Sequence, residues 1–144
     1  DAELWSMAGL LHDIDYGRTE GNPREHGLVA EGMLRGVANE EIVQAIKAHN
    51  YENTGVEPRS AMEKALIAAD SISGLVIACA LVMPSRRLDE VTTKTIDKKL
   101  KDKDFARGSS RERILLCESV GITREKFLEI ALKALQGISQ QLGL

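Results

Sequence analysis

Apolar residues recur at helical spacing through most of the chain, and no stretch alternates between apolar and polar residues as a strand would. In residues 2–12, Trp5, Ala8 and His12 share one helical face, and the loop sequence DYGRTEGNP follows. The same reasoning predicts further helices, namely residues 24–35, 39–50, 60–83, 88–103, a segment that begins near 109, and 123–142. The pattern therefore predicts an all-α fold of six or seven helices.

The expected helix ends carry the residue types that helix ends favour. Asn39 is suited to cap the helix that follows it, and Gly36 is suited to end the one before. Two segments, SAME at 60–63 and SSRE at 109–112, have the spacing of a capping box. Pro84 cannot continue a helix, so it ends the long apolar one.

Length and composition favour one helical bundle. The chain has 144 residues, of which 43% are hydrophobic and only 3% aromatic, so its core consists mainly of Leu, Ile, Val and Ala. We therefore expect a compact multi-helix bundle that forms a single domain over residues 1–144. The chain starts at Asp1, in the middle of a helical pattern, and we expect that it lacks an upstream N-terminal segment.

Charge and apolar content narrow the classes of partner. The net charge of −3 and the pI of about 5.7 provide no strong attraction to nucleic acid or to an anionic membrane. The longest apolar stretch, SGLVIACALVMP, is too short to span a bilayer. Cys79 and Cys117 match no metal or redox spacing, so we expect buried free thiols and a cytoplasmic protein.

Every histidine in the chain projects from an apolar helix face. His12 follows Trp5 and Ala8 on one face, and the other two have apolar residues three, four or seven positions away: His26 and His49. Taken singly, each could be an ordinary core histidine. Their joint placement, together with Asp13 beside His12, favours a metal site because neutral imidazoles and carboxylates are good ligands for divalent ions.

Asp70 also lies on an apolar helix face. Its helix contains no Lys or Arg from Ile67 through Pro84, so no cation on that helix compensates the carboxylate. A metal ion would compensate Asp70, although bonds to the amides of a neighbouring loop would satisfy it too. Asp13 alone could likewise be a simple turn residue.

Four segments resemble the HD-domain superfamily of metal-dependent phosphohydrolases. The resemblance covers residues 1 to about 80 and lies in the order His-Asp, His, His and Asp, in the segments LLHDID at 10–15, EHG at 25–27, AIKAHN at 45–50 and KALIAADSISGL at 64–75. It implies that His12, Asp13 and Asp70 bind a first metal, with Asp13 bridging. It also implies that His26 and His49 hold a second metal.

The resemblance has two departures. The family's first histidine would lie upstream of Asp1, and Tyr16 stands where many relatives carry a lysine. The implied cofactor is one or two divalent ions of Fe, Mn, Zn, Co, Ni or Mg. Residues that could orient the ligands by hydrogen bonds are Asp15, Glu25 and Asn50.

The resemblance implies a phosphohydrolase that cleaves a phosphoester of a nucleotide or a related small phosphorylated molecule. Asp13 is the candidate catalytic residue, because it would hold the ions that activate a water. Two alternatives remain open: a di-iron oxygenase of the same fold, and a non-catalytic metal-binding or regulatory module. An oligomer is compatible with each of these functions.

The segment KTIDKKLKDKDFARGSSRER, at residues 94–113, is rich in Lys and Arg. It could be a solvated helix face, or it could receive the charged part of a phosphorylated substrate. Under the second interpretation the substrate-binding residues in this segment are Lys98, Lys99, Arg107 and Arg111. Arg18 is a further candidate for substrate binding, because Tyr16 cannot supply the positive charge of the lysine that it replaces.

Overall fold

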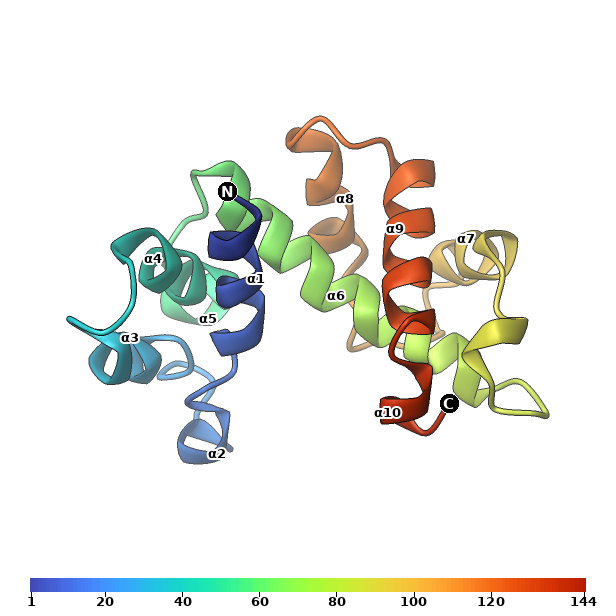
Figure 1. The fold of residues 1–144 in the computed structure, drawn as a ribbon, viewed down its shortest axis with the longest axis horizontal. Helices are drawn as coiled ribbons and strands as arrows, with labels where there is room; N and C mark the ends of the chain where they lie inside the picture. Colours follow the sequence, from blue (N-terminus) through green and yellow to red (C-terminus); the bar gives the residue numbers. More distant parts are fainter. The chain divides into compact units, whose positions relative to one another are not determined.

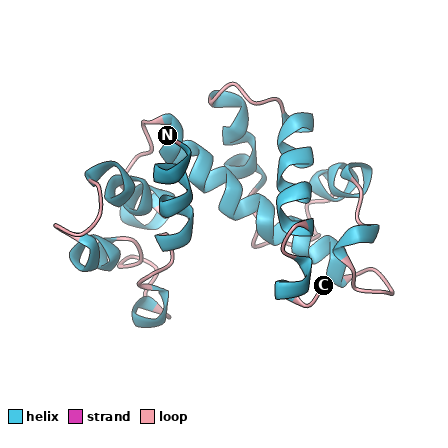
Figure 2. Cartoon of the chain, viewed as in Figure 1, coloured by secondary structure: helices cyan, strands magenta, loops and turns pink.

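The computed structural model describes all 144 residues, and its regular structure is helical throughout (Figures 1 and 2). This confirms the predicted all-α fold. The elements are α1 (Ala2–Leu11), α2 (Tyr16–Thr19), α3 (Leu28–Leu34), α4 (Glu40–His49), α5 (Tyr51–Thr54), α6 (Ala61–Leu81), the 3₁₀ helix η1 (Leu88–Glu90), α7 (Thr93–Lys101), α8 (Arg111–Ser119), α9 (Arg124–Gln136) and α10 (Ser139–Leu142).

The chain divides into two compact units, Asp1–Ile67 and Ala68–Leu144, and the division falls within α6. Each unit has its own hydrophobic cluster. Ala8, Ile46 and Leu66 belong to the first cluster, whereas Ile72 and Leu75 belong to the second. The expectation of a single domain over residues 1–144 stays a prediction.

In the first unit, α1 and α3 both pack against α4 (Figure 1). Helix α4 buries Ile42, Ala45 and Ile46, and the small residues Ala8 and Ala30 allow the neighbouring helices to approach closely. Asn39 caps α4 by accepting a hydrogen bond from the Glu41 amide at 2.8 Å, as the sequence predicts. The buried face of α4 continues to its last residue, His49, so the packing of this helix fixes that side chain.

The predicted capping box at the start of α6 is confirmed. The Ser60 hydroxyl accepts a hydrogen bond from the Glu63 amide at 3.2 Å and donates one to the Glu63 carboxylate at 2.8 Å. That carboxylate also accepts the Arg59 amide at 2.5 Å. The cap therefore satisfies the Glu63 amide in the first turn of the longest helix and fixes the segment before it.

Gly27 sits where the turn before α3 meets α4. Its φ is +91°, and a Cβ at this position would lie 3.0 Å from the Ile46 carbonyl oxygen, which belongs to the backbone of α4. We expect Gly27→Ala to lower the free energy of unfolding by about 2–4 kcal/mol in urea denaturation, because it combines backbone strain with a steric clash. Gly21→Ala is the matched control, since Gly21 has a φ of +85° but no atom within 4 Å of the added Cβ. Equal losses in the two variants would contradict the role given to the clash.

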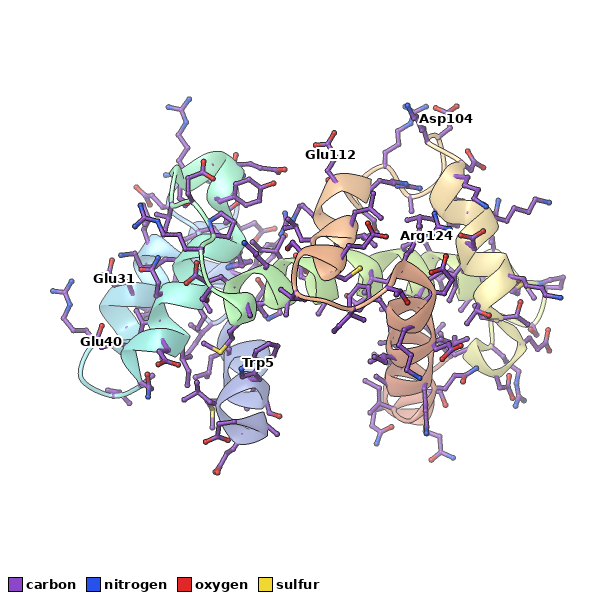
Figure 3. All side chains as sticks on the ribbon, turned by 90° about the horizontal axis from the view of Figure 1, so that it is seen from above. Trp5, Glu31, Glu40, Asp104, Glu112 and Arg124 are labelled. Carbon is purple, nitrogen blue, oxygen red and sulfur yellow. The ribbon has the colours of Figure 1, made fainter.

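In the second unit, α9 packs against α7, α8 and η1 (Figure 1). Cys79 and Cys117 lie in its hydrophobic cluster as buried free thiols, as predicted, and burial raises the pKa of both. Arg124, at the start of α9, pairs with Asp97 of α7 at 3.4 Å (Figure 3).

Several predicted boundaries are wrong. The segment predicted as a helix from 24 begins its regular helix only at Leu28, and the segment 88–103 is divided into η1 and α7. This division arises because Thr92 caps α7, its hydroxyl accepting the Thr95 amide at 3.2 Å.

The C-terminal segment 123–142 is interrupted after Gln136, so it forms α9 and α10 rather than one helix. Ser110, and not Ser109, caps α8, and its hydroxyl accepts the Arg113 amide at 3.3 Å. Ser109 is buried instead. The two serines are adjacent and chemically identical, so the sequence pattern does not distinguish them.

Helix α6 is long and apolar enough, by length and composition alone, to cross a membrane, with a mean hydropathy of 1.7. The apolar run is therefore longer than the sequence pattern indicates. The core helix of a soluble protein passes the same test, and α6 supplies Leu66 to the first cluster and Leu75 to the second. We interpret it as a core helix. Cytoplasmic location stays a prediction.

Candidate metal centre

The His12–Asp13 pair lies where α1 ends. His12 is the C-cap of α1, and its Nδ1 donates a hydrogen bond to the Gly9 carbonyl at 2.8 Å. This bond directs Nε2 outward, where it lies 3.3 Å from Asp13 Oδ2. The Asp13 side chain is 53% exposed. The end of the helix thus places a carboxylate at the surface, within reach of solvent, beside an oriented imidazole.

His26 and His49 approach the same carboxylate from other elements. His26 lies in the turn before α3, and His49 is the last residue of α4. Their Nε2 atoms are 2.9 Å apart, and they lie 3.2 Å and 3.7 Å, respectively, from Asp13 Oδ1. Ligand atoms of Asp13, His26 and His49 lie within 4.8 Å of one another. The fold therefore brings together three of the predicted ligands.

The hydrogen bonds of the two rings determine which nitrogens face the cluster. His26 Nδ1 lies 2.8 Å from Asp15 Oδ1, and His49 Nδ1 contacts the Ile46 carbonyl. A carboxylate and a carbonyl only accept hydrogen bonds, so both Nδ1 atoms carry the proton. In the neutral rings, two Nε2 lone pairs then face each other across 2.9 Å, which is repulsive unless a proton or a metal ion lies between them. This donor set fits a divalent ion.

Asp15 holds His26 in this orientation. The Asp15 side chain is fully buried, and its Oδ2 accepts the amides of Gly27 at 2.8 Å and Ala30 at 2.9 Å. One carboxylate therefore fixes both the first turn of α3 and the His26 ring. Asn50 adds support, because its Nδ2 donates to the His26 carbonyl at 3.0 Å. Glu25, the third residue considered for such a role, is exposed.

The electrostatics of the cluster favour an ionised Asp13. When the imidazoles carry their second proton, a hydrogen bond from His49 and the charges of all three histidines lower the pKa of the Asp13 carboxyl below its usual value, and partial burial opposes the shift only in part. The two Asp13 oxygens face different histidines: Oδ2 faces His12, and Oδ1 faces His26 and His49. A carboxylate placed in this way can bridge two ions.

A comparison with family models matches residues 1–75 to the HD domain, which is more than half of the 144 residues. The chain belongs to the HD domain family. Comparisons with curated proteins and with solved structures give no match. Membership indicates a metal-dependent, hydrolase-type function and the binding of divalent metals.

The HD domain match includes Asp70, which belongs to the second compact unit. Its Oδ2 lies 3.0 Å from Nη2 of Arg113, on α8, and the two side chains are 36% and 16% exposed. The sequence shows only that no cation on the same helix can pair with Asp70, and it does not reveal this partner on α8. Arg113 is 43 residues away, and no local pattern signals the contact. The role of Asp70 as a ligand of the first metal stays a prediction.

Of the residues predicted to bind substrate, Arg18 lies in the same unit as the histidine cluster. It is exposed on α2, two residues after Tyr16. The others lie in the second unit. Arg107 pairs with Asp104 at 2.9 Å, and Lys99 lies 4.4 Å over the Phe105 ring. Both remain near the surface.

Arg111 also lies in the second unit. Its guanidinium donates to six backbone carbonyls of the segment 99–109, those of Lys99, Leu100, Asp102, Phe105, Ala106 and Ser109. Its N–H groups are therefore engaged within this loop, which the residue holds in place. Its role in substrate binding stays a prediction.

Proposed function

We propose that this HD domain is a metal-dependent phosphohydrolase that cleaves a phosphoester of a small phosphorylated molecule, with nucleotides as one substrate class. One observation carries the proposal: His26 and His49 present their Nε2 atoms 2.9 Å apart beside Asp13 Oδ1, while both Nδ1 protons are held by other acceptors. Three ligand atoms directed at one point are typical of a metal site that keeps a position open for a substrate or water.

A divalent ion bound there would make a water nucleophilic at neutral pH and would polarise a phosphoryl oxygen. The chain's own residues prepare the site. Asp15 holds the proton of His26 on Nδ1, so Nε2 stays free to bind a cation. His12, Asp13 and Asp70 are the proposed ligands of a first ion, and His26 and His49, with Asp13 bridging, those of a second. Exposed Arg18 is a candidate for contact with phosphoryl oxygens.

The test is elemental analysis of the purified chain, followed by a screen of phosphoesters with Mn, Fe, Zn, Co, Ni or Mg. We expect metal-dependent release of phosphate both with and without oxygen. A strict requirement for oxygen would support the di-iron oxygenase instead. A metal-loaded protein that turns over no substrate in the screen would support the non-catalytic module.

His26 and His49 are expected to matter for the second ion alone. We expect His49→Ala to lower the metal content by about one ion per chain without emptying the site, because His12 and Asp13 remain. Elemental analysis after gel filtration measures this ratio, and His26→Ala should give the same loss. An unchanged ratio in both variants would make these residues ordinary core histidines.

A further inference from the structure

A cavity of about 150 Å³ lies beside the candidate metal centre, within the first unit. It is formed by α2 and the turn that follows it, and it is lined by Tyr16, Thr19, Glu20, Gly21, Pro23 and His26. His26 belongs to both sites. Its ring meets the Tyr16 ring edge-on, with centroids 5.8 Å apart, and its Nε2 lies 3.2 Å from Asp13. A group in the cavity is therefore separated from the Asp13 carboxylate by one imidazole ring.

The size of the cavity limits what it can hold. A protein cavity on the order of 150 Å³ accommodates a single aromatic ring, whereas pockets for whole ligands span roughly 300–1,000 Å³. The cavity therefore accepts one ring of a substrate and leaves the rest outside.

The chemistry of the cavity walls disfavours a phosphate group in the cavity, in addition to the one that is hydrolysed at the metal centre. The lining contains no Lys or Arg, and Glu20 contributes a negative charge that repels a phosphate group. Tyr16 is 57% exposed and offers a ring for stacking, with the Pro23 ring as a further apolar surface. Carboxylate and phenol oxygens can accept hydrogen bonds from the N–H groups of a nucleobase, such as an exocyclic amino group. The walls thus favour a planar, uncharged ring that carries N–H donors.

The walls are held in place before any ligand binds. The buried Thr19 hydroxyl donates to the Asp15 carbonyl at 3.1 Å, and Asn50 Nδ2 donates to the Pro23 carbonyl at 2.6 Å. Asp15 and Asn50 also support His26. One set of hydrogen bonds therefore fixes both the cavity and the candidate ligand, which lowers the cost of ordering on binding.

We propose that this cavity binds the nucleobase of a nucleotide substrate, with Tyr16 as the stacking residue. The proposal rests on the proposed function and makes it more specific, since it selects substrates with a planar ring near the phosphoester. The ring enters between Tyr16 and Pro23, and Glu20 accepts its N–H groups at the rim. Tyr16 is then a specificity-determining residue whose ring meets the His26 ring edge-on and is not itself a proposed metal ligand.

The kinetic test compares adenosine 5′-monophosphate with ribose 5-phosphate, which lacks the ring. We expect Tyr16→Ala to reduce the preference for the nucleotide, measured as the ratio of the two kcat/KM values, by about tenfold, as expected for a lost stacking contact. Tyr16→Phe keeps the ring and should keep most of the preference. Trp5→Ala is the control, because Trp5 is also exposed but lies on α1 outside the cavity. An unchanged preference in Tyr16→Ala would overturn the proposal.

A second test does not depend on turnover. Saturation-transfer NMR with adenosine alone, on protein treated with a chelator, reports contact through the adenine ring protons. We expect transfer with the parent chain, Tyr16→Phe and Trp5→Ala, and loss of transfer with Tyr16→Ala. No transfer with the parent chain would overturn the base-binding proposal even if phosphoesters are hydrolysed. Tyr16-dependent transfer without hydrolysis of any phosphoester would support the cavity and contradict the phosphohydrolase.

Discussion

We expect Asp13→Asn to abolish both metal binding and hydrolysis. The Asp13 carboxylate lies at the centre of the cluster, with Oδ2 3.3 Å from His12 Nε2 and Oδ1 3.2 Å from His26 Nε2. Asparagine has the same shape but is neutral, and its amide nitrogen cannot coordinate an ion as the lost oxygen does. We expect kcat to fall by at least about a hundredfold, more than the loss caused by removing an outer hydrogen-bond partner of a metal ligand. Elemental analysis and a phosphate-release assay measure the two effects.

The control must separate the loss of a ligand from the loss of the fold. Asp13 is half exposed, so the substitution leaves no cavity, and circular dichroism should show unchanged helicity. Asp104→Asn is the matched variant, because the Asp104 side chain is 87% exposed in the second unit and should keep the full metal content. Retention of the full metal content by Asp13→Asn would mean that the bound ion does not depend on the Asp13 carboxylate, and would contradict its role as a ligand.

The helix that sequence periodicity predicts best is one with both a side-chain cap and a continuous buried face. The segment 39–50 has both a cap at Asn39 and a continuous apolar face, and it forms α4. The segment 24–35 is different, because the Asp15 carboxylate binds the amides of Gly27 and Ala30 and supports turns before Leu28. That carboxylate lies more than ten residues away, so a local pattern cannot reveal its effect.

In the candidate site, too, local sequence patterns indicate some residues, whereas others depend on contacts between distant segments. Asp13, His26 and His49 are indicated by the order of the motif, and His49 also by the apolar face of α4, whereas His26 lies in the turn before α3 and not on a helix face. The supporting contacts are different: the sequence offers Asp15 only as one of three candidates and does not show that it binds His26, and Arg113 meets Asp70 across 43 residues. A motif therefore indicates which residues can bind an ion, whereas the contacts that select the imidazole tautomer require the fold.

The Lys-rich segment shows how composition alone misleads. Arg111 carries the same charge as its neighbours in the sequence, yet its guanidinium is enclosed by carbonyls of the segment 99–109. Arg107 remains exposed. The difference depends on how the chain turns after α7, and charge patterning contains no information about that turn.

Asp15 combines stability and function in one buried side chain. Its two oxygens accept hydrogen bonds from His26 Nδ1, the Gly27 amide and the Ala30 amide at 2.8–2.9 Å. Asp15→Ala leaves all three donors without their partner in a closed environment. Because each unsatisfied buried donor costs about 1–3 kcal/mol, we expect the free energy of unfolding to fall by about 3–5 kcal/mol.

The same substitution should weaken the metal site. Without Asp15, His26 can rotate or move its proton to Nε2, so we expect metal affinity to fall by about 10–100-fold. Urea denaturation measures the stability, metal titration measures the affinity, and ¹⁵N chemical shifts of His26 report the tautomer. Glu25→Ala is the control, since Glu25 is the exposed acid next to His26 and should change neither quantity.

Asp15→Asn separates the two roles. Asparagine keeps one oxygen, so it can accept either from His26 or from the amides of Gly27 and Ala30, and its NH₂ group then faces the remaining donors. If the oxygen stays with the amides, stability is largely kept while the His26 tautomer changes and metal affinity falls. If the oxygen instead accepts from His26, the metal affinity is kept and the first turn of α3 is lost. A variant that keeps parental stability, tautomer and affinity together would contradict the claim that both oxygens of Asp15 are needed, because a single acceptor cannot replace contacts on opposite sides of the carboxylate.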